Sequence, residues 1–224
     1  YFTLFTEISL YWNNVQIKTC FEQNVDGVWI KQFGDLNLDV NRFKNIWLIN
    51  YSMLFVSVLS FVNFRWFNNL YFSAINFLFT GILTLILIAS ELILLAELRE
   101  NYLNPIFNPN FDVSVFHLII RYVSYLFYAV LIYAFYRFVI PLFKEPVFKI
   151  IFEVTLSIII VILCSSELVN ILNLTGSEGV YKIGLSILWG IFSFILVGYG
   201  IWRKNKYLRI TAIALFGITL IKLF

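Results

Sequence analysis

Long apolar runs separated by shorter polar segments dominate the pattern of hydrophobic and polar positions along the chain. Six of these runs approach the length that a helix needs to cross a hydrocarbon core of about 30 Å. Residues 1–12 are predicted to be the end of a further transmembrane helix, and residues 13–43 an extracytoplasmic polar loop. The pattern predicts membrane-spanning helices at about residues 46–64, 70–96, 114–140, 147–172, 180–202 and 207–224.

Run length favours helices over the strands of a membrane barrel. A barrel strand has about 9–11 residues and alternates polar with apolar positions, whereas these runs are longer and apolar on all faces. The predicted fold is therefore all-α, a polytopic transmembrane helical bundle built of tandem two-helix hairpins, with residues 44–224 as a six-helix transmembrane region. Because the chain starts and stops inside apolar runs, we expect it to be a fragment of a larger protein.

The composition agrees with a membrane protein and limits the kinds of functional site that the chain can contain. The chain is 61% hydrophobic and 13% charged, against about 45–50% and 25% in soluble domains. A net charge of +3 is too small and too dispersed to indicate a nucleic-acid partner. The two cysteines, Cys20 and Cys164, and the single histidine, His117, have no metal-ligand spacing. We therefore expect no metal and no cofactor, and a lipid bilayer and other membrane proteins as partners.

Basic residues concentrate in the tightest connections between the predicted helices. The loops at 65–69, 141–146 and 203–206 are short and cationic, whereas those at 97–113 and 173–179 are more acidic, as is the long polar loop. Lys and Arg in short loops mark the cytoplasmic side of a membrane protein. We predict that the tight loops are cytoplasmic. Their basic turns are formed by Arg65, Arg137, Arg203, Lys204, Lys206 and Arg209.

Three helix ends share a hydroxyl residue, a glutamate and an aliphatic residue. They are Thr6-Glu7-Ile8, Ser90-Glu91-Leu92 and Ser166-Glu167-Leu168, and an arginine marks the turn of each hairpin between them. The recurrence predicts tandem duplication of a two-helix unit, as in some transporters. The alternative is chance, because a glutamate near a helix end can reach the interface wherever it occurs.

The last third of the chain carries short motifs in a recognisable order. They are Ser165-Ser166-Glu167-Leu168, Leu185-Ser186, Leu188-Trp189, the segment from Gly200 to Lys206, Leu208-Arg209, and the segment from Thr219 to Phe224. This region, residues 165–224, resembles the C-terminal region of a bacterial family of predicted membrane proteins known as domain of unknown function 2339. The resemblance implies a long multi-helix protein and a multi-pass location in the bacterial inner membrane. It implies no activity, and the long polar segment 13–43 departs from the usual short loop.

Charged groups inside apolar sequence are the best candidates for function, because each is costly in a bilayer. Glu7, Glu91 and Glu167 are predicted to line an outward-facing polar cavity, with His117 and Arg121 as partners on one helix face. The alternative roles are anchoring at the interface and hydrogen bonding to a neighbouring helix. A second set is predicted to pack helix against helix, namely Ser186, Trp189, Gly190, Ala214 and Gly217.

Three classes of function are compatible with these residues. The leading one is a multi-pass membrane protein of transport or envelope-associated type, with carboxylates facing a polar cavity. The first alternative is a structural or assembly subunit of a membrane protein complex, and the second is an intramembrane transferase. The sequence leans away from an enzyme, because it contains no nucleophile elbow, phosphate loop or dinucleotide fingerprint.

Overall fold

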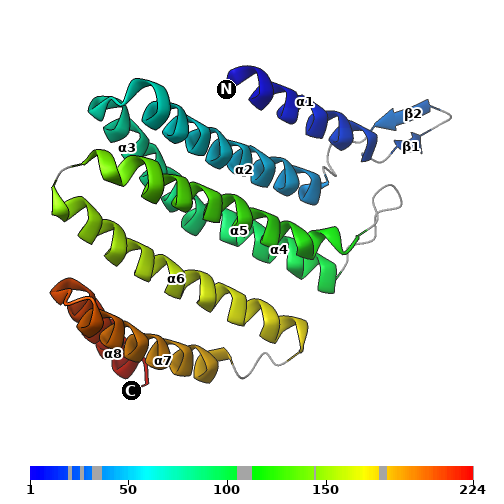
Figure 1. The fold of residues 1–224 in the computed structure, drawn as a ribbon. Helices are drawn as coiled ribbons and strands as arrows, with labels where there is room; N and C mark the ends of the chain where they lie inside the picture. The colour runs from blue at the N-terminus through cyan, green and yellow to red at the C-terminus, as the bar shows by residue number, and fades with distance from the viewer. Residues whose placement is uncertain are drawn as a thin grey trace. The chain divides into compact units, whose positions relative to one another are not determined.

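The computed structural model describes residues 1–19, 22–25, 28–31, 37–104, 113–143, 145–176 and 181–223. These residues are almost entirely helical apart from one short β-hairpin (Figure 1). They form two compact units, Tyr1–Leu142 and Phe143–Phe224. The predicted all-helical membrane architecture is confirmed.

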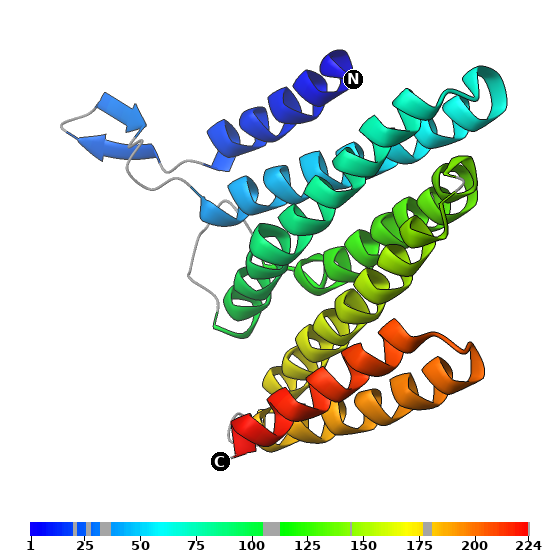
Figure 2. The same cartoon turned by 90° about the vertical axis from the view of Figure 1, so that its left-hand side faces the viewer.

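The first unit consists of long helices that run side by side (Figures 1 and 2). Helix α2 packs against α1, α3 and α5, and α4 packs against α5. Short π-helical or 3₁₀ segments prolong three of the helices or join them into longer rods. The elements are α1 (Phe2–Thr19), β1 (Glu22–Val25), β2 (Val28–Lys31), α2 (Leu38–Val62), η1 (Asn63–Phe67), α3 (Leu70–Ile86), η2 (Leu87–Glu91), α4 (Leu92–Leu103), α5 (Phe116–Ala134), η3 (Phe135–Val139) and η4 (Ile140–Leu142).

Among the described residues, five rods are long and apolar enough to cross a membrane. They are Leu38–Phe67, Leu70–Leu103, Phe116–Leu142, Val147–Leu174 and Ile183–Trp202. The sixth predicted span, residues 207–224, corresponds to α8 (Lys206–Leu223). The last residue of that span lies outside the described residues, so its crossing of the membrane stays a prediction.

The described residues within the predicted polar loop 13–43 are mostly helix or strand, which moves the helix boundaries on both sides of it. Helix α1 continues to Thr19, and α2 begins at Leu38 rather than near residue 46. The side chain of Asn37 caps α2 by accepting a hydrogen bond of 3.0 Å from the backbone N–H of Asp39. Between these helices, β1 and β2 pair as an antiparallel hairpin. The length of an apolar run matches the thickness of the hydrocarbon layer. The helix itself can be longer, because it continues beyond the run through polar residues.

Two tight turns, one in each unit, are built in the same way. Asn68 and Lys204 both adopt the left-handed conformation, with φ of 46° and 51°. The next residue, Asn69 or Asn205, then caps the following helix, its side-chain oxygen accepting from the backbone N–H two residues on, at 2.8 and 3.0 Å. The same local chemistry therefore reverses the chain at the basic end of both hairpins.

The second unit contains α6 (Pro146–Leu174), α7 (Tyr181–Trp202) and α8, of which α7 and α8 pack most closely. A Cβ added at Gly200 would lie 2.7 Å from Cγ of Arg209, so the glycine permits this close approach. Gly190 and Gly217, predicted as packing positions, have no described atom within 4 Å of an added Cβ. Close approach therefore occurs at the end of the hairpin rather than along its middle.

The other predicted packing residues occupy different environments. Trp189 is half-buried, and its indole N–H donates a hydrogen bond of 2.8 Å to the hydroxyl of Ser165 on α6. Ser186 is also half-buried, whereas Ala214 is exposed. Ala212 instead is the fully buried small residue of α8. Sequence spacing identified α7 and α8 as packing helices but not which of their faces meet.

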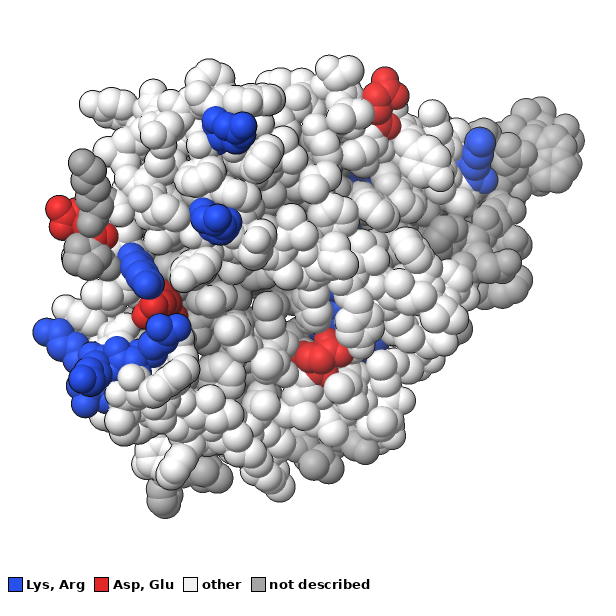
Figure 3. Space-filling model, in the orientation of Figure 1, with Lys and Arg blue, Asp and Glu red and all other residues white. Residues whose placement is uncertain are grey.

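Most of the surface shown in Figure 3 carries neither basic nor acidic side chains. Large apolar residues are exposed on the spanning helices of both units, as expected for surfaces that face hydrocarbon. The residues of the predicted basic turns are all exposed, from Arg65 in η1 to Arg209 in α8. Among them, the guanidinium of Arg203 lies over the rings of Tyr199 and Trp202, at 5.6 and 5.5 Å.

Candidate functional site

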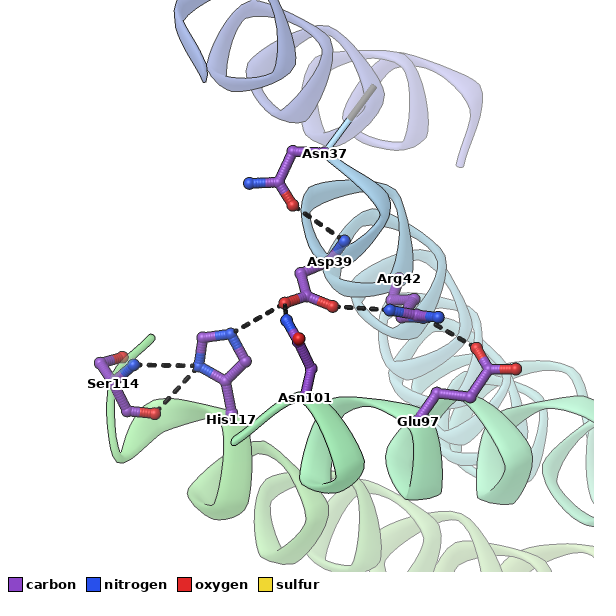
Figure 4. A network of polar contacts seen from close by, with 7 residues as sticks. All are labelled: Asn37, Asp39, Arg42, Glu97, Asn101, Ser114 and His117. Carbon is purple, nitrogen blue, oxygen red and sulfur yellow. Dashed lines mark hydrogen bonds and ion pairs between the residues drawn. The ribbon is translucent and has the colours of Figure 1, made fainter. Parts of the chain in front are cut away.

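A polar cluster with a buried centre joins α2, α4 and α5, at the end of α2 far from its Asn68 turn (Figure 4). Asp39 is its centre. One carboxylate oxygen accepts from the guanidinium of Arg42 at 2.7 Å, and the other accepts from the side-chain amide of Asn101. Nε2 of His117 lies 3.4 Å from the second oxygen. The side chains of His117 and Asp39 are only 1% and 3% exposed, so this contact is shielded from solvent.

The edges of the cluster tie these groups to their helices. Arg42 also donates from Nε to Glu97 on α4 at 2.8 Å. Nδ1 of His117 lies 2.9 Å from the carbonyl oxygen of Ser114, just before α5. Asp39 is in the first turn of α2, where the helix dipole favours an acid, and Arg42 follows at the i+3 position on the same face. Local sequence therefore positions the acid, and the other two helices supply its remaining partners.

Two buried arginines lie deeper, on α4 and α5. Arg99 and Arg121 are 7% and 3% exposed, and their charges are close enough to repel each other. Arg121 donates from Nε to the hydroxyl of Tyr125 at 3.0 Å. Nε of Arg99 has no hydrogen-bond acceptor among the described residues. This end of the unit is thus rich in buried positive charge.

Glu91 lies farther into the membrane-spanning region, at the last position of the π-helical turn η2. Its side chain is 0% exposed, and neither carboxylate oxygen forms a hydrogen bond of regular geometry with a described residue. The hydroxyl of Ser124 on α5 is the polar group that interacts with it most closely. That hydroxyl in turn accepts a hydrogen bond of 3.1 Å from the side-chain amide of Asn50 on α2. Glu91 is therefore surrounded by three helices and faces neutral polar groups.

The side chain of Ser90, next to Glu91 in the sequence, bonds to its own helix. The side chain of Ser90 donates to the carbonyl oxygen of Ile86 at 3.1 Å, which competes with the regular helical pattern. Ser90 also lines an apolar groove of about 520 Å³ between α1, α2 and the α3–α4 rod, whereas Glu91 is not part of the lining. The two adjacent residues thus face different sides of the rod.

The structure places the predicted cavity residues in different environments. Glu91, His117 and Arg121 are all buried in the first unit, but His117 pairs with Asp39 and Arg121 with Tyr125. Glu7 is exposed on α1. Glu167 belongs to the second unit, where it is half-buried and accepts a hydrogen bond of 3.3 Å from Asn170. A single cavity lined by all three glutamates stays a prediction.

Several buried polar residues were missed by the sequence reading, which weighed charge and ignored neutral groups. Spacing contained the missing signal, because polar residues recur at intervals of three or four along α3, the spacing of one helix face. Asp39, Arg99 and Asn101 were missed for another reason, since they fell in the predicted loops 13–43 and 97–113. The missed residues are the buried Asp39, Asn50, Asn76 and Arg99 and the half-buried Asn101.

A family model described as "Predicted membrane protein (DUF2339)" matches residues 17–224. The chain belongs to the DUF2339 family. The match includes the five membrane-spanning rods, the second unit and the first unit from residue 17 onward, so it extends the resemblance seen at residues 165–224 to nearly the whole chain. No curated protein and no solved structure matches the chain. The DUF2339 description names a membrane protein and no activity, so what the site does must be argued from its chemistry.

Within the described residues, no group of three or more His, Cys, Asp or Glu side chains could hold a metal ion. The chemistry offered by this DUF2339 protein in the first unit is instead that of a carboxyl group among hydroxyls and amides. A carboxylate without partners in an apolar interior is costly, and taking up a proton removes that cost. The arrangement around Glu91 is suited to holding and releasing a proton.

Proposed function

We propose that the first unit is a proton-linked element of a membrane transport protein in the bacterial inner membrane, and that Glu91 is its proton-carrying group. The proposal rests on the complete burial of Glu91 in a membrane-spanning rod, where no charged group pairs with its carboxylate in the described structure and the hydroxyl of Ser124 is its polar neighbour. Ionisable residues inside membrane segments are expensive, and they commonly mark ion pathways and proton relays. A structural role would instead favour a paired carboxylate such as that of Asp39.

The local backbone supports this role. Glu91 ends a π-helical turn in which the N–H of Leu92 bonds to the carbonyl oxygen of Leu87. Single π-helical turns inside α-helices occur frequently at functional sites. Such a turn has a poorer hydrogen-bond pattern than the α-helix, so the rod can change pitch there at lower cost. A change in the protonation of Glu91 could then be coupled to movement of the rod.

Replacing Glu91 by Gln tests the proposal, because the amide keeps the shape of the side chain but cannot carry a proton. The full chain is reconstituted in liposomes that contain a pH-sensitive dye, and proton entry is driven by a potassium diffusion potential. We expect Glu91→Gln to reduce proton entry by about tenfold or more. Equal entry in the variant and the wild type would overturn the proposal.

Glu100→Gln is the matched control. Glu100 lies on the same rod but is exposed, and it bonds only to the nearby Asn104 in the described structure. Its removal should leave proton entry unchanged. Both variants should also be compared for folded yield in detergent, so that a loss of proton entry is not mistaken for a loss of protein.

A structural subunit is the second candidate, favoured by the polar cluster around Asp39. The side chains of that cluster connect the ends of three helices, and nearly all of them form hydrogen bonds or ion pairs with one another. If the protein is only a scaffold, Glu91→Gln should raise or preserve its thermal stability and leave its partners bound. Co-purification of membrane proteins with wild type and variant would then be identical.

We further propose that the tight turns lie in the cytoplasm. The basic side chains at these turns support this orientation. In a variant lacking Cys20 and Cys164, Trp66→Cys in η1 should be protected from an impermeant maleimide added to intact cells. Asn104→Cys, just beyond α4, should be labelled. The reverse pattern would invert the orientation.

A further inference from the structure

Buried polar side chains continue from Glu91 to the opposite end of the first unit. Ser73, Asn76, Thr80 and Thr84 follow one another on α3 at intervals of three or four residues, and all are buried. This spacing places them on one face, which is turned toward the interior of the unit. These four residues, together with Asn63 of η1 and with Ser124 and Tyr128 of α5, form a row of buried polar groups that we call the polar seam.

Direct hydrogen bonds join parts of the seam. At the turn end, the side-chain amide of Asn63 donates to the hydroxyl of Ser73 at 2.8 Å. In the middle, the hydroxyls of Thr84 and Tyr128 lie 3.3 Å apart across α3 and α5. The other seam residues that follow one another along α3 or α5 are three or four positions apart, so they are separated by about one helical turn, a rise of about 5.4 Å. A gap of that size between two polar groups is spanned by one bridging water.

The threonine hydroxyls can accept hydrogen bonds from such water but cannot form a relay alone. Thr80 donates to the carbonyl oxygen of Asn76, and Thr84 donates to that of Thr80, both at 2.8 Å. With the hydroxyl hydrogen committed to the backbone, each oxygen presents its remaining lone pair to the seam. Proton movement along the seam therefore requires water, and the side chains hold that water in place.

Asn76 is the strongest sign that water is present. Its side chain is 0% exposed, and neither its amide nitrogen nor its oxygen has a hydrogen-bond partner among the described residues. Leaving a buried amide without partners is costly, and native proteins satisfy such groups with ordered water. An amide can both donate to and accept from water, so it can hold a water molecule in a defined orientation.

We infer that the polar seam binds a file of water molecules, with Asn76 as a water-binding position, and that this file carries protons between Glu91 and the Asn63 turn. The inference rests on the proposed function and gives it a route. A protonated Glu91 releases its proton to the nearest water and becomes a carboxylate. The excess proton passes from water to water toward the turn, and a second proton restores the neutral acid.

The first test asks whether the seam is wet and does not depend on activity. The full chain, labelled with ¹⁵N, is placed in lipid bilayers, and magnetisation is transferred from water protons to side-chain amides by solid-state NMR. We expect transfer to the Asn76 amide in wild type and in Glu91→Gln. Absence of transfer at Asn76, with transfer observed at the exposed Asn104, would show a dry seam and overturn the inference.

The second test asks whether the water file carries the current. Tyr128→Phe removes one hydroxyl of the seam, and Asn76→Leu replaces the amide with an apolar group of similar size. Each should reduce proton entry into liposomes by about tenfold. Tyr133→Phe is the matched control, because Tyr133 lies on the same helix but is 65% exposed. It should leave proton entry unchanged.

The outcomes separate the route from the proposed function. If Glu91→Gln abolishes proton entry while Asn76→Leu and Tyr128→Phe retain it, Glu91 carries protons by another route and the inference fails. If Glu91→Gln itself has no effect, the proposed function fails. Thermal stability gives a further check on Asn76→Leu. A dry site would be stabilised by losing an unpaired amide, whereas a hydrated one would not.

Discussion

The two units of this membrane protein differ in what their helices enclose. In the first unit, 33–39% of the apolar stretch of each spanning rod is buried, and the interior contains Asp39, Asn50, Asn76 and Glu91. In the second unit, only 11% and 17% of the apolar stretches of the two spanning rods are buried, and the described buried polar side chains are neutral. The first unit therefore encloses charged and polar groups, while the second buries less of its spanning helices and only neutral polar groups.

This difference indicates different sources of cohesion. Lipid is as apolar as leucine, so apolar surface alone does not drive helices together in a membrane. The first unit gains cohesion from polar groups that have no alternative partner in hydrocarbon. The second relies on close backbone approach at Gly200 and on single bonds such as that from Trp189 to Ser165. We therefore expect that removing a buried polar side chain lowers the stability strongly only in the first unit.

The largest effect is expected from Asp39→Ala. Removing the central acid leaves His117 buried without its carboxylate and takes one of two acidic partners from the half-buried Arg42, at a cost of about 3–5 kcal/mol. Thermal unfolding in detergent measures the loss. Glu97→Gln is the control, because Glu97 is 45% exposed and its pairing with Arg42 is worth only about 0–1 kcal/mol. Equal losses in the two variants would show that burial does not set the strength of this cluster.

A smaller effect is expected in the second unit from Gly200→Ala. The added methyl group would press on the side chain and backbone of Arg209, at a cost of about 1–3 kcal/mol. Gly190→Ala meets open space in the described structure and should be neutral or slightly stabilising. Guanidinium denaturation in detergent compares the two. A greater loss at Gly190 would mean that α7 and α8 pack through the middle of the hairpin.

The smallest effect is expected from Trp189→Phe, which removes the bond to Ser165 while keeping most of the apolar surface. The loss should be about 0.5–1.5 kcal/mol, the usual net value of one hydrogen bond. Trp202→Phe, at a side chain that is 76% exposed, is the control and should change stability less. Tryptophan fluorescence during thermal unfolding follows both variants. A loss at Trp189 as large as that at Asp39 would contradict the contrast between the units.

Sequence reasoning predicted the long helices, because their apolar runs must match the thickness of hydrocarbon. It also identified Glu91 as a residue held within apolar sequence. It missed the helical parts of residues 13–43, since polar residues continue a helix beyond the membrane without any change in hydropathy. The tandem repeat stays a prediction, although the matching turns at Asn68–Asn69 and Lys204–Asn205 support it.

The sequence by itself determined that this is a helical membrane protein and that charge is concentrated at the ends of its helices. Only the tertiary structure decided which residues meet. His117 and Arg121 were expected to face Glu91 or Glu167, but the packing of α2 against α5 brings His117 to Asp39 and leaves Glu91 facing Ser124. Periodicity assigns a residue to a face of its own helix. Its partner depends on how neighbouring helices are rotated and shifted, and that is set by contacts between residues far apart in the chain.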